Sequence, residues 1–158
     1  MKSVDNYEIG TNTVAIIPID ENTSRVCEDE EEYIVNKSSN SIIKENCEFY
    51  GSSYEGRCIG TKYLTGIKTK TPIILEESRN IIFFPTSSTR SQQSTWIALN
   101  KIKNYHSCPT KRGIIVFKNE EELPLDISFY SLDNQIVRAT MLKSKLYEIK
   151  HAENLNEN

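Results

Sequence analysis

"SLDNQIVRATMLKSKLYEIK", residues 131–150, has apolar side chains every three or four positions, whereas the apolar runs before it are short and typical of strands. That spacing places the apolar side chains on one face of a helix. Ser131 suits the N-cap, and Asp133 suits the positive N-terminal end of the helix. The stretch therefore predicts a C-terminal amphipathic helix near residues 131–150, whose apolar face comprises Leu132, Ile136, Ala139, Leu142, Leu146 and Ile149.

The preceding part of the chain contains apolar runs bounded by Gly, Pro, Asn or charge, as strands usually are. Residues 112–128, "RGIIVFKNEEELPLDIS", suit a hairpin that turns near Asn119 to Glu122, with Pro124 restricting the second strand to an edge or a strand start. Residues 7–20 predict another hairpin about a Gly-Thr-Asn turn. Further strands are expected within residues 62–77, 80–86 and 95–106.

A short helix is expected near residues 39–50, because Ile42, Ile43 and Cys47 have nearly helical spacing and Gly51 suits a C-terminal stop. The predicted fold class is thus α+β, with a strand-rich central region and a closing helix. A chain of 158 residues with 37% hydrophobic composition suits one domain. We place this domain at residues 1–150, followed by a polar C-terminal tail at residues 151–158.

Targeting signals and ligand motifs are not evident in the sequence. No stretch has the apolar length of a signal peptide or a membrane helix, so we expect a cytoplasmic protein without a membrane partner. The four cysteines are irregularly spaced and are interpreted as free thiols. Zinc sites need paired Cys or His spacings that these residues do not supply, so we expect no metal and no cofactor.

The charge is unevenly distributed along the chain. The net charge is -3 overall, but it is -7 for residues 1–48, +8 for residues 49–118 and -4 for residues 119–158. A basic central segment in an acidic protein can present one positive surface to a polyanion such as DNA. The alternative is a solvated surface whose charges have no binding role.

The segment "GSSYEGRC", residues 51–58, has the glycine spacing of a phosphate-binding loop. Arg57 and Cys58, however, replace the Lys and the hydroxyl residue that such a loop uses to bind phosphate and magnesium. With two histidines in the chain and no Ser-His or Cys-His signature, the sequence also lacks an evident nucleophile and base. We therefore expect neither an NTPase nor another enzyme.

A second polar stretch, "FFPTSSTRSQQSTW" at residues 83–96, combines hydroxyls, amides and one Arg behind a Pro. Such side chains contact phosphate oxygens and acceptors on the groove floor of DNA. Residues 51–58 repeat the pattern, since both stretches have adjacent serines followed by an Arg. We interpret them as two loops that each deliver one guanidinium group, with a plain polar surface loop as the alternative.

Four blocks of the chain resemble the ComK family, the competence transcription factors of Bacillus-type bacteria. They are "CEFYGSSYEGR", "KTPIILEES", "IIFFPTSSTRSQQSTWIAL" and "FYSLDNQIVRATMLKSKL", and they occur in the family's order. The resemblance extends from Tyr7 to about Lys145, and the first and third blocks are its most specific parts.

The resemblance implies a self-associating regulator that binds A·T-rich promoter boxes in double-stranded DNA, chiefly through the minor groove, and activates genes for DNA uptake. The narrow minor groove of A·T-rich DNA attracts inserted Arg side chains, so Arg57 and Arg90 are the candidate reading residues. Hydroxyl residues would position the DNA and lysines would add salt-dependent attraction. The full set of candidate DNA-binding residues is Ser52, Ser53, Arg57, Lys68, Lys70, Thr86, Ser88, Thr89 and Arg90.

The C-terminus departs from the family pattern. Longer members continue past the closing helix into a tail tied to activation and regulated proteolysis, whereas this sequence ends in "HAENLNEN". RNA polymerase and a proteolytic adaptor are thus partners that the resemblance implies but the short C-terminus leaves open. The alternative function is a non-catalytic protein-interaction module that pairs with a fuller relative and modulates it.

Overall fold

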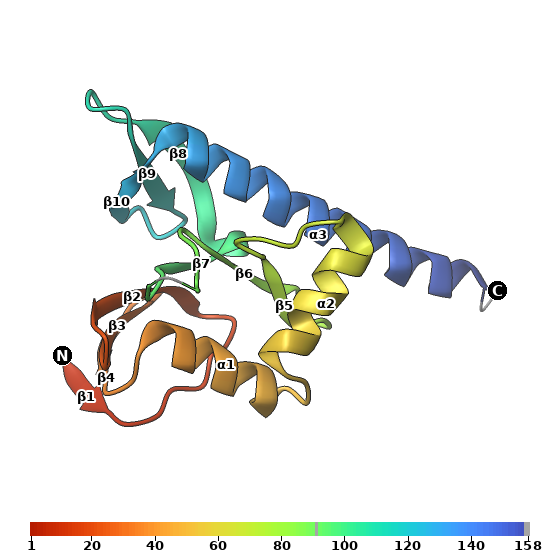
Figure 1. Ribbon diagram of the computed structural model, residues 1–158, viewed down its shortest axis with the longest axis horizontal. Coiled ribbons are helices and arrows are strands. Elements are labelled where there is room, and N and C mark those ends of the chain that lie inside the picture. Colours follow the sequence, from red (N-terminus) through yellow and green to blue (C-terminus); the bar gives the residue numbers. More distant parts are fainter. Residues whose placement is uncertain (91, 157–158) are drawn as a thin grey trace.

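The computed structural model describes residues 1–90 and 92–156, and the side chains of residues 1–90 and 92–152. Within these residues the chain forms a seven-stranded sheet, a three-stranded sheet and three α-helices (Figure 1). The predicted α+β class is confirmed. The C-terminal end of helix α3 (Phe129–Asn156) projects beyond both sheets.

The seven-stranded sheet has the order β1-β4-β3-β2-β7-β6-β5, and its pairs are antiparallel except for β1 with β4. Strands β2 and β7 are in register at only two pairs, Ala15 with Ile97 and Ile16 with Trp96. The strands are β1 (Lys2–Val4), β2 (Thr13–Asp20), β3 (Thr23–Glu28), β4 (Glu32–Val35), β5 (Ile73–Glu76), β6 (Ile81–Pro85) and β7 (Trp96–Ala98).

The hairpin expected within residues 7–20 is wrong, because residues 5–12 form no strand. The segment is held by Asn46, whose Oδ1 accepts from the Ile9 N–H at 2.8 Å and whose Nδ2 donates to the Tyr7 carbonyl at 2.9 Å. A side-chain amide thus satisfies the backbone groups that a partner strand would have satisfied. The hairpin instead joins β2 to β3 through a turn at Glu21 and Asn22.

The three-stranded sheet contains β8 (Ile102–Ser107), β9 (Arg112–Phe117) and β10 (Glu122–Ser128), in the order β10-β9-β8. A short 3-10 helix, η1 (Leu99–Lys101), connects it to β7. The β9–β10 hairpin turns where the sequence predicts, and the Phe117 N–H donates to the Glu121 carbonyl at 2.9 Å. Pro124 lies in the edge strand β10, as expected.

Helices α1 and α3 confirm the two predicted helices. Helix α1 (Ser39–Phe49) is capped by Ser38, and Gly51 follows it with a positive φ of 86°. Helix α3 begins two residues before the expected start because Ser128, rather than Ser131, is the cap, its Oγ accepting from the Ser131 N–H at 3.1 Å. It continues through residues 151–156 of the expected tail.

Helix α2 (Tyr54–Thr65) lies where the sequence predicts a polar loop followed by a strand, so that part of the interpretation is wrong. Ser53 caps it by accepting from the Gly56 N–H at 2.9 Å, and Gly66 ends it in the left-handed conformation. Thr61 is its one buried residue, which explains why no apolar period marks the helix.

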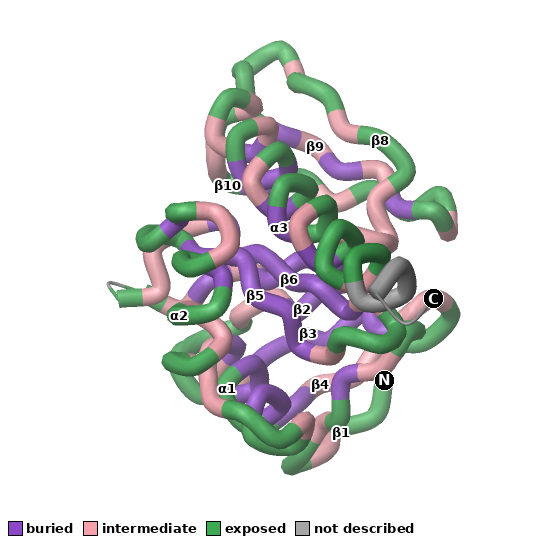
Figure 2. Tube along the Cα trace, turned by 90° about the vertical axis from the view of Figure 1, so that its right-hand side faces the viewer, coloured by how far each residue is buried: buried purple, intermediate pink, exposed green. Residues whose placement is uncertain are grey.

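The core has two parts, one on each face of the large sheet (Figure 2). In β6, Ile82 and Phe84 join the cluster that contains the buried side chains of α3, whereas Ile81 and Phe83 join the cluster that contains those of α1. Successive strand residues point to opposite faces of a sheet, so β6 is covered on both sides. The loops at the two ends of β6 and β7 are thereby attached to a rigid centre.

Candidate nucleic-acid interface

The loop between β6 and β7 contains the predicted residues Thr86, Ser88, Thr89 and Arg90. Its base is closed by a hydrogen bond from the Thr86 N–H to the Thr95 carbonyl at 2.9 Å, and the Ser87 and Ser94 hydroxyls lie 2.8 Å apart. Thr86 is buried, whereas Ser88 and Thr89 are partly exposed and Arg90 is exposed. Thr86 therefore supports the loop from within, whereas Ser88, Thr89 and Arg90 are open to solvent.

Asn40, in the first turn of α1, holds the middle of this loop. Its Nδ2 donates to the Thr89 carbonyl at 3.3 Å and to the Gln92 carbonyl at 3.2 Å. Its Oδ1 accepts from Trp96 Nε1 at 3.0 Å. Nothing in the sequence marks Asn40 for this role, because a polar side chain at the start of a helix is usually no more than part of the cap.

The N-terminal end of α2 lies against the same loop. The Tyr54 hydroxyl is 3.3 Å from Thr89 Oγ1, and the Tyr54 ring packs edge-on against Trp96 with the ring centroids 6.2 Å apart. Ser52 and Ser53 immediately precede this helix. The structure therefore brings Ser52, Ser53 and Thr89 to one surface, where the positive end of the α2 dipole favours anions.

The segment that carries Lys68 and Lys70 is held beside the end of β6 by α3. Buried Gln135 donates from Nε2 to the Lys70 carbonyl at 3.0 Å and to the Pro85 carbonyl at 2.6 Å. Arg138 donates to the Thr69 carbonyl at 2.5 Å. Gln135 was missed, although a polar residue within the apolar arc of a helix is a signal of such a role.

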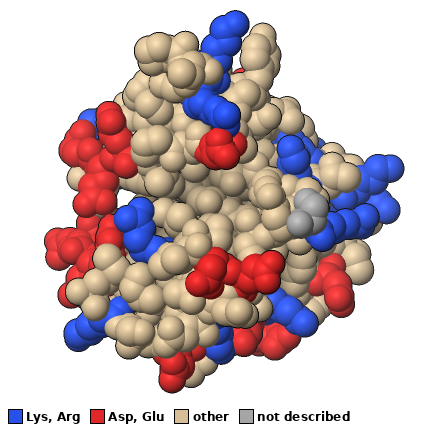
Figure 3. Space-filling model, turned by 60° about the vertical axis from the view of Figure 1, so that its left-hand side comes forward, with Lys and Arg blue, Asp and Glu red and all other residues tan. Residues whose placement is uncertain are grey.

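Three of the predicted cations on this side of the molecule are not neutralised. Lys68, Lys70 and Arg90 are exposed, and no described carboxylate lies within ion-pair distance of any of them. Figure 3 shows a cluster of Lys and Arg at the right-hand edge of the view and a cluster of Asp and Glu at the left-hand edge. The uneven charge along the sequence thus corresponds to an uneven distribution of charged side chains on the surface.

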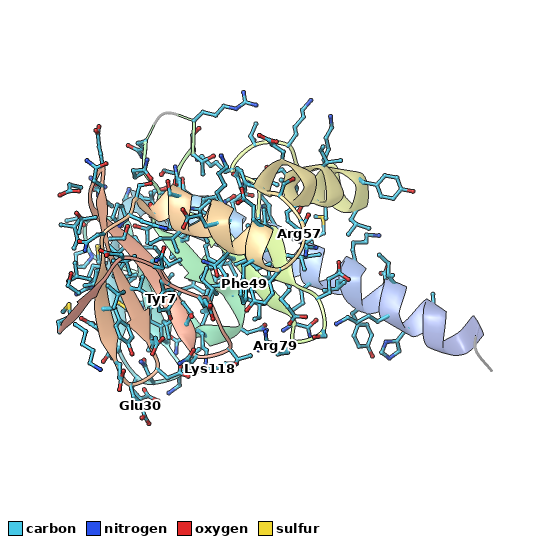
Figure 4. The ribbon with its side chains drawn as sticks, turned by 90° about the horizontal axis from the view of Figure 1, so that it is seen from below. Tyr7, Glu30, Phe49, Arg57, Arg79 and Lys118 are labelled. Atoms are coloured by element: carbon cyan, nitrogen blue, oxygen red, sulfur yellow. The ribbon has the colours of Figure 1, made fainter. Side chains whose placement is uncertain are left out.

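Arg57 does not join this surface. Its Nη1 pairs with Glu77 Oε1 at 3.2 Å, its Nη2 donates to the Leu75 carbonyl at 3.4 Å, and its side chain is only 17% exposed. Figure 4 places it between α2 and β5. The two similar stretches predicted two loops that each deliver one guanidinium, but Arg57 lies on α2 and its guanidinium is bound to Glu77 and to the Leu75 carbonyl.

The thiols of Cys47 and Cys58 are both affected by burial. Burial raises the pKa of Cys47 to about 12 and also raises the pKa of Cys58, so both favour the neutral form.

Among the side chains that the structure describes, no three His, Cys, Asp or Glu residues converge as metal ligands. In the described part of the chain, none of the helices has the length and apolar character needed to cross a membrane.

Comparison with known proteins agrees with the resemblance seen in the sequence. No solved structure matches the chain. The "Competence transcription factor" of Bacillus subtilis (strain 168) is 32% identical over 149 residues, which cover 92% of this chain and 77% of the relative. The family model described as "ComK protein" matches residues 4–150. The chain belongs to the ComK family.

Proposed function

We propose that this chain is a DNA-binding regulator of competence gene transcription and not an enzyme. The observation that carries the proposal is a surface of unneutralised cations at one end of β6, in a chain whose relative is a competence transcription factor. We call it the β6–β7 surface and define it by Ser52, Ser53, Lys68, Lys70, Ser88, Thr89 and Arg90. Double-stranded promoter DNA is its proposed ligand, and a cytoplasmic location follows from that role.

Arg90 is the proposed reader of A·T-rich boxes through the minor groove. It is exposed at the tip of a loop whose middle is held by Asn40 and whose base is closed by backbone bonding. A guanidinium on such a support can enter a narrow groove with little additional loss of backbone conformational entropy. Arg57 is assigned a supporting role, because its guanidinium is already bound to Glu77 and Leu75.

The remaining members of the surface would position the DNA backbone. Lys68 and Lys70 supply positive charge on a segment fixed by Gln135 and Arg138. Ser52 and Ser53 lie at the N-terminal end of α2, where the helix dipole adds to the attraction for a phosphate. These contacts carry no sequence information, so the A·T preference depends on Arg90.

Self-association and protein partners form the second part of the proposal. Large apolar side chains are exposed on two helices, with Ile59 and Tyr63 on α2 and Tyr130 and Val137 on α3. Exposed apolar groups of this kind favour contact with another protein. They favour self-association, and they also support the alternative of an interaction module that pairs with a fuller relative. RNA polymerase and a proteolytic adaptor are further proposed partners.

The test is fluorescence anisotropy with an A·T-box duplex, a G·C-rich duplex and a single strand, each at low and at physiological salt. We expect preference for the A·T duplex at physiological salt, and loss of that preference in Arg90→Ala. Arg25→Ala is the control, because Arg25 is partly exposed and pairs with Glu32 in the acidic first third of the chain. Equal binding to all three nucleic acids, abolished by salt, would contradict the proposal and favour the interaction module.

A further inference from the structure

A second site of positive charge lies at the opposite end of strands β2, β6 and β7 from the β6–β7 surface. An open cavity of about 180 Å³ is lined by the loop before β2, the turn before β6 and the start of that strand, and η1 with the residue after β9. Strands β2 and β7 stop pairing before this end, since Ala15 with Ile97 is their last pair toward it. The cavity therefore occupies the gap between two strands that diverge.

The lining of this cavity suits an anion. Arg79, Lys101 and Lys118 line it, and no carboxylate occurs among its described lining residues. The amides of Asn80 and Asn100 and the hydroxyl of Thr11 add neutral hydrogen-bonding groups. Figure 4 shows Arg79 and Lys118 near one another at the lower edge of the view, on the side of the molecule away from α2.

Two of the three cations are held in place by other groups. Arg79 Nε pairs with Glu76 Oε2 at 2.9 Å, and its Nη2 donates to the Tyr50 hydroxyl at 3.3 Å. Lys101 Nζ pairs with Asp29 Oδ2 at 2.8 Å. These partners fix the cations without lining the cavity, so the two side chains are pre-oriented for a ligand.

The third cation is free to bind, and a fourth lies behind the cavity wall. No described carboxylate lies within ion-pair distance of exposed Lys118. Lys150 Nζ, from α3, donates to Asn80 Oδ1 at 3.1 Å and to the Glu77 carbonyl. Four cations thus surround a space near which Glu76 and Asp29 supply two negative charges, and the surplus is positive.

We propose that this cavity is a binding site for a small phosphate-bearing anion. A guanidinium beside two ammonium groups and neutral donors is a combination suited to phosphate oxygens. The volume of about 180 Å³ is below the roughly 300 Å³ at which sites for drug-sized ligands begin, so inorganic phosphate or a small phosphorylated metabolite is the class that fits.

The same chemistry could be supplied by a DNA phosphate, but the position favours a free anion. Strand β6 has five residues, which span roughly 15 Å at the usual rise per strand residue. The cavity is lined by its first three residues, whereas Arg90 follows its other end. The cavity and the β6–β7 surface therefore lie toward opposite ends of the strand, and we take a free anion as the ligand of the cavity. The proposal goes beyond DNA binding and does not depend on it.

The experiment is isothermal titration calorimetry of the full chain with sodium phosphate and with sodium pyrophosphate, at an ionic strength held constant with chloride. We expect saturable binding by the wild type, and binding about tenfold weaker in Lys118→Gln, the usual effect of losing one charge-assisted contact. Arg79→Lys keeps the charge but loses the planar fork, so it should also weaken binding. Lys2→Gln, which removes an exposed Lys of β1 far from the cavity lining, should bind as the wild type does.

Two further measurements separate the possible outcomes. Thermal unfolding without ligand checks that Lys118→Gln and Arg79→Lys are folded, and anisotropy with the A·T duplex tests whether DNA is the source of the anion. Unchanged DNA affinity in Lys118→Gln, together with weaker phosphate binding, supports the proposal. Absence of saturation, equal affinity in Lys118→Gln and Lys2→Gln, or weakening of DNA binding alone would overturn it.

Discussion

Trp96 Nε1 donates a hydrogen bond to Asn40 Oδ1 at 3.0 Å, and this contact links the second strand of the β6–β7 unit to the first turn of α1. Trp96 is buried in the core, with 1% of its surface exposed. A buried indole N–H needs an acceptor, and here the acceptor belongs to the residue that also binds the loop carbonyls of Thr89 and Gln92. Core packing and the position of Arg90 are therefore coupled through Asn40.

Asn40→Ala should lower both stability and DNA affinity. It leaves Trp96 Nε1 and two loop carbonyls without their described partners, at a cost of about 1 to 3 kcal/mol in the free energy of unfolding. Urea denaturation measures this loss, and anisotropy with the A·T duplex measures the loss of loop order. Asn104→Ala, at an exposed position of β8, is the control and should change neither by a comparable amount. Full DNA affinity in Asn40→Ala would show that the loop does not need this support.

Arg57→Ala and Arg90→Ala should differ in what they damage. Arg57 ties α2 to β5 through Glu77 and Leu75, so its removal should lower the free energy of unfolding by about 1 kcal/mol. Arg90 is exposed and pairs with no described carboxylate, so its removal should leave stability within about 0.5 kcal/mol of the wild type while reducing the preference for A·T DNA. Denaturation curves and duplex binding of both variants check this. A reversed pattern would return Arg57 to the reading role.

The accuracy of the sequence predictions depends on how regularly each element buries apolar side chains. Helix α3 was predicted because Leu132, Ile136, Ala139 and Leu142 follow one period and are buried. Helix α2 was missed because Thr61 is the one residue that it buries, so its polar and glycine-containing sequence looks like a loop. Local caps and stops mark its ends, but only tertiary contacts show that it is a helix.

The candidate site was predictable from the sequence only in part. Arg90 and Thr89 lie on a loop, where residue type indicates the possible contacts directly. The direction of Arg57 depends on α2, and the roles of Asn40 and Gln135 depend on carbonyls more than forty residues away in sequence, so local patterns could not reveal them.

Two glycine substitutions should have opposite effects on stability. A Cβ at Gly113 in β9 would lie 2.7 Å from Leu132 Cδ2 and 3.2 Å from Leu132 Cβ. Because Leu132 is buried, Gly113→Ala should destabilise the protein by about 1 to 3 kcal/mol. Gly60 in α2 has no described atom within 4 Å of its added Cβ, so Gly60→Ala should stabilise by about 0.5 to 1 kcal/mol through helix propensity. Thermal and urea denaturation measure the sign of the stability change in each variant. An unchanged stability in Gly113→Ala would mean that Leu132 can move aside.

The Glu76 carboxylate makes stability depend on acid pH. Burial alone would raise its pKa, but hydrogen bonds from Ser78 and Arg79 outweigh burial and lower the pKa from 4.5 to about 2. A lowered folded-state pKa means that the stabilisation is complete above about pH 4.5 and is lost as the pH falls toward 2. Urea midpoints of the wild type and Glu76→Gln should therefore differ most at neutral pH and converge between pH 4.5 and 2. A difference that stays constant across this range would show that the charge of Glu76 does not stabilise the folded protein.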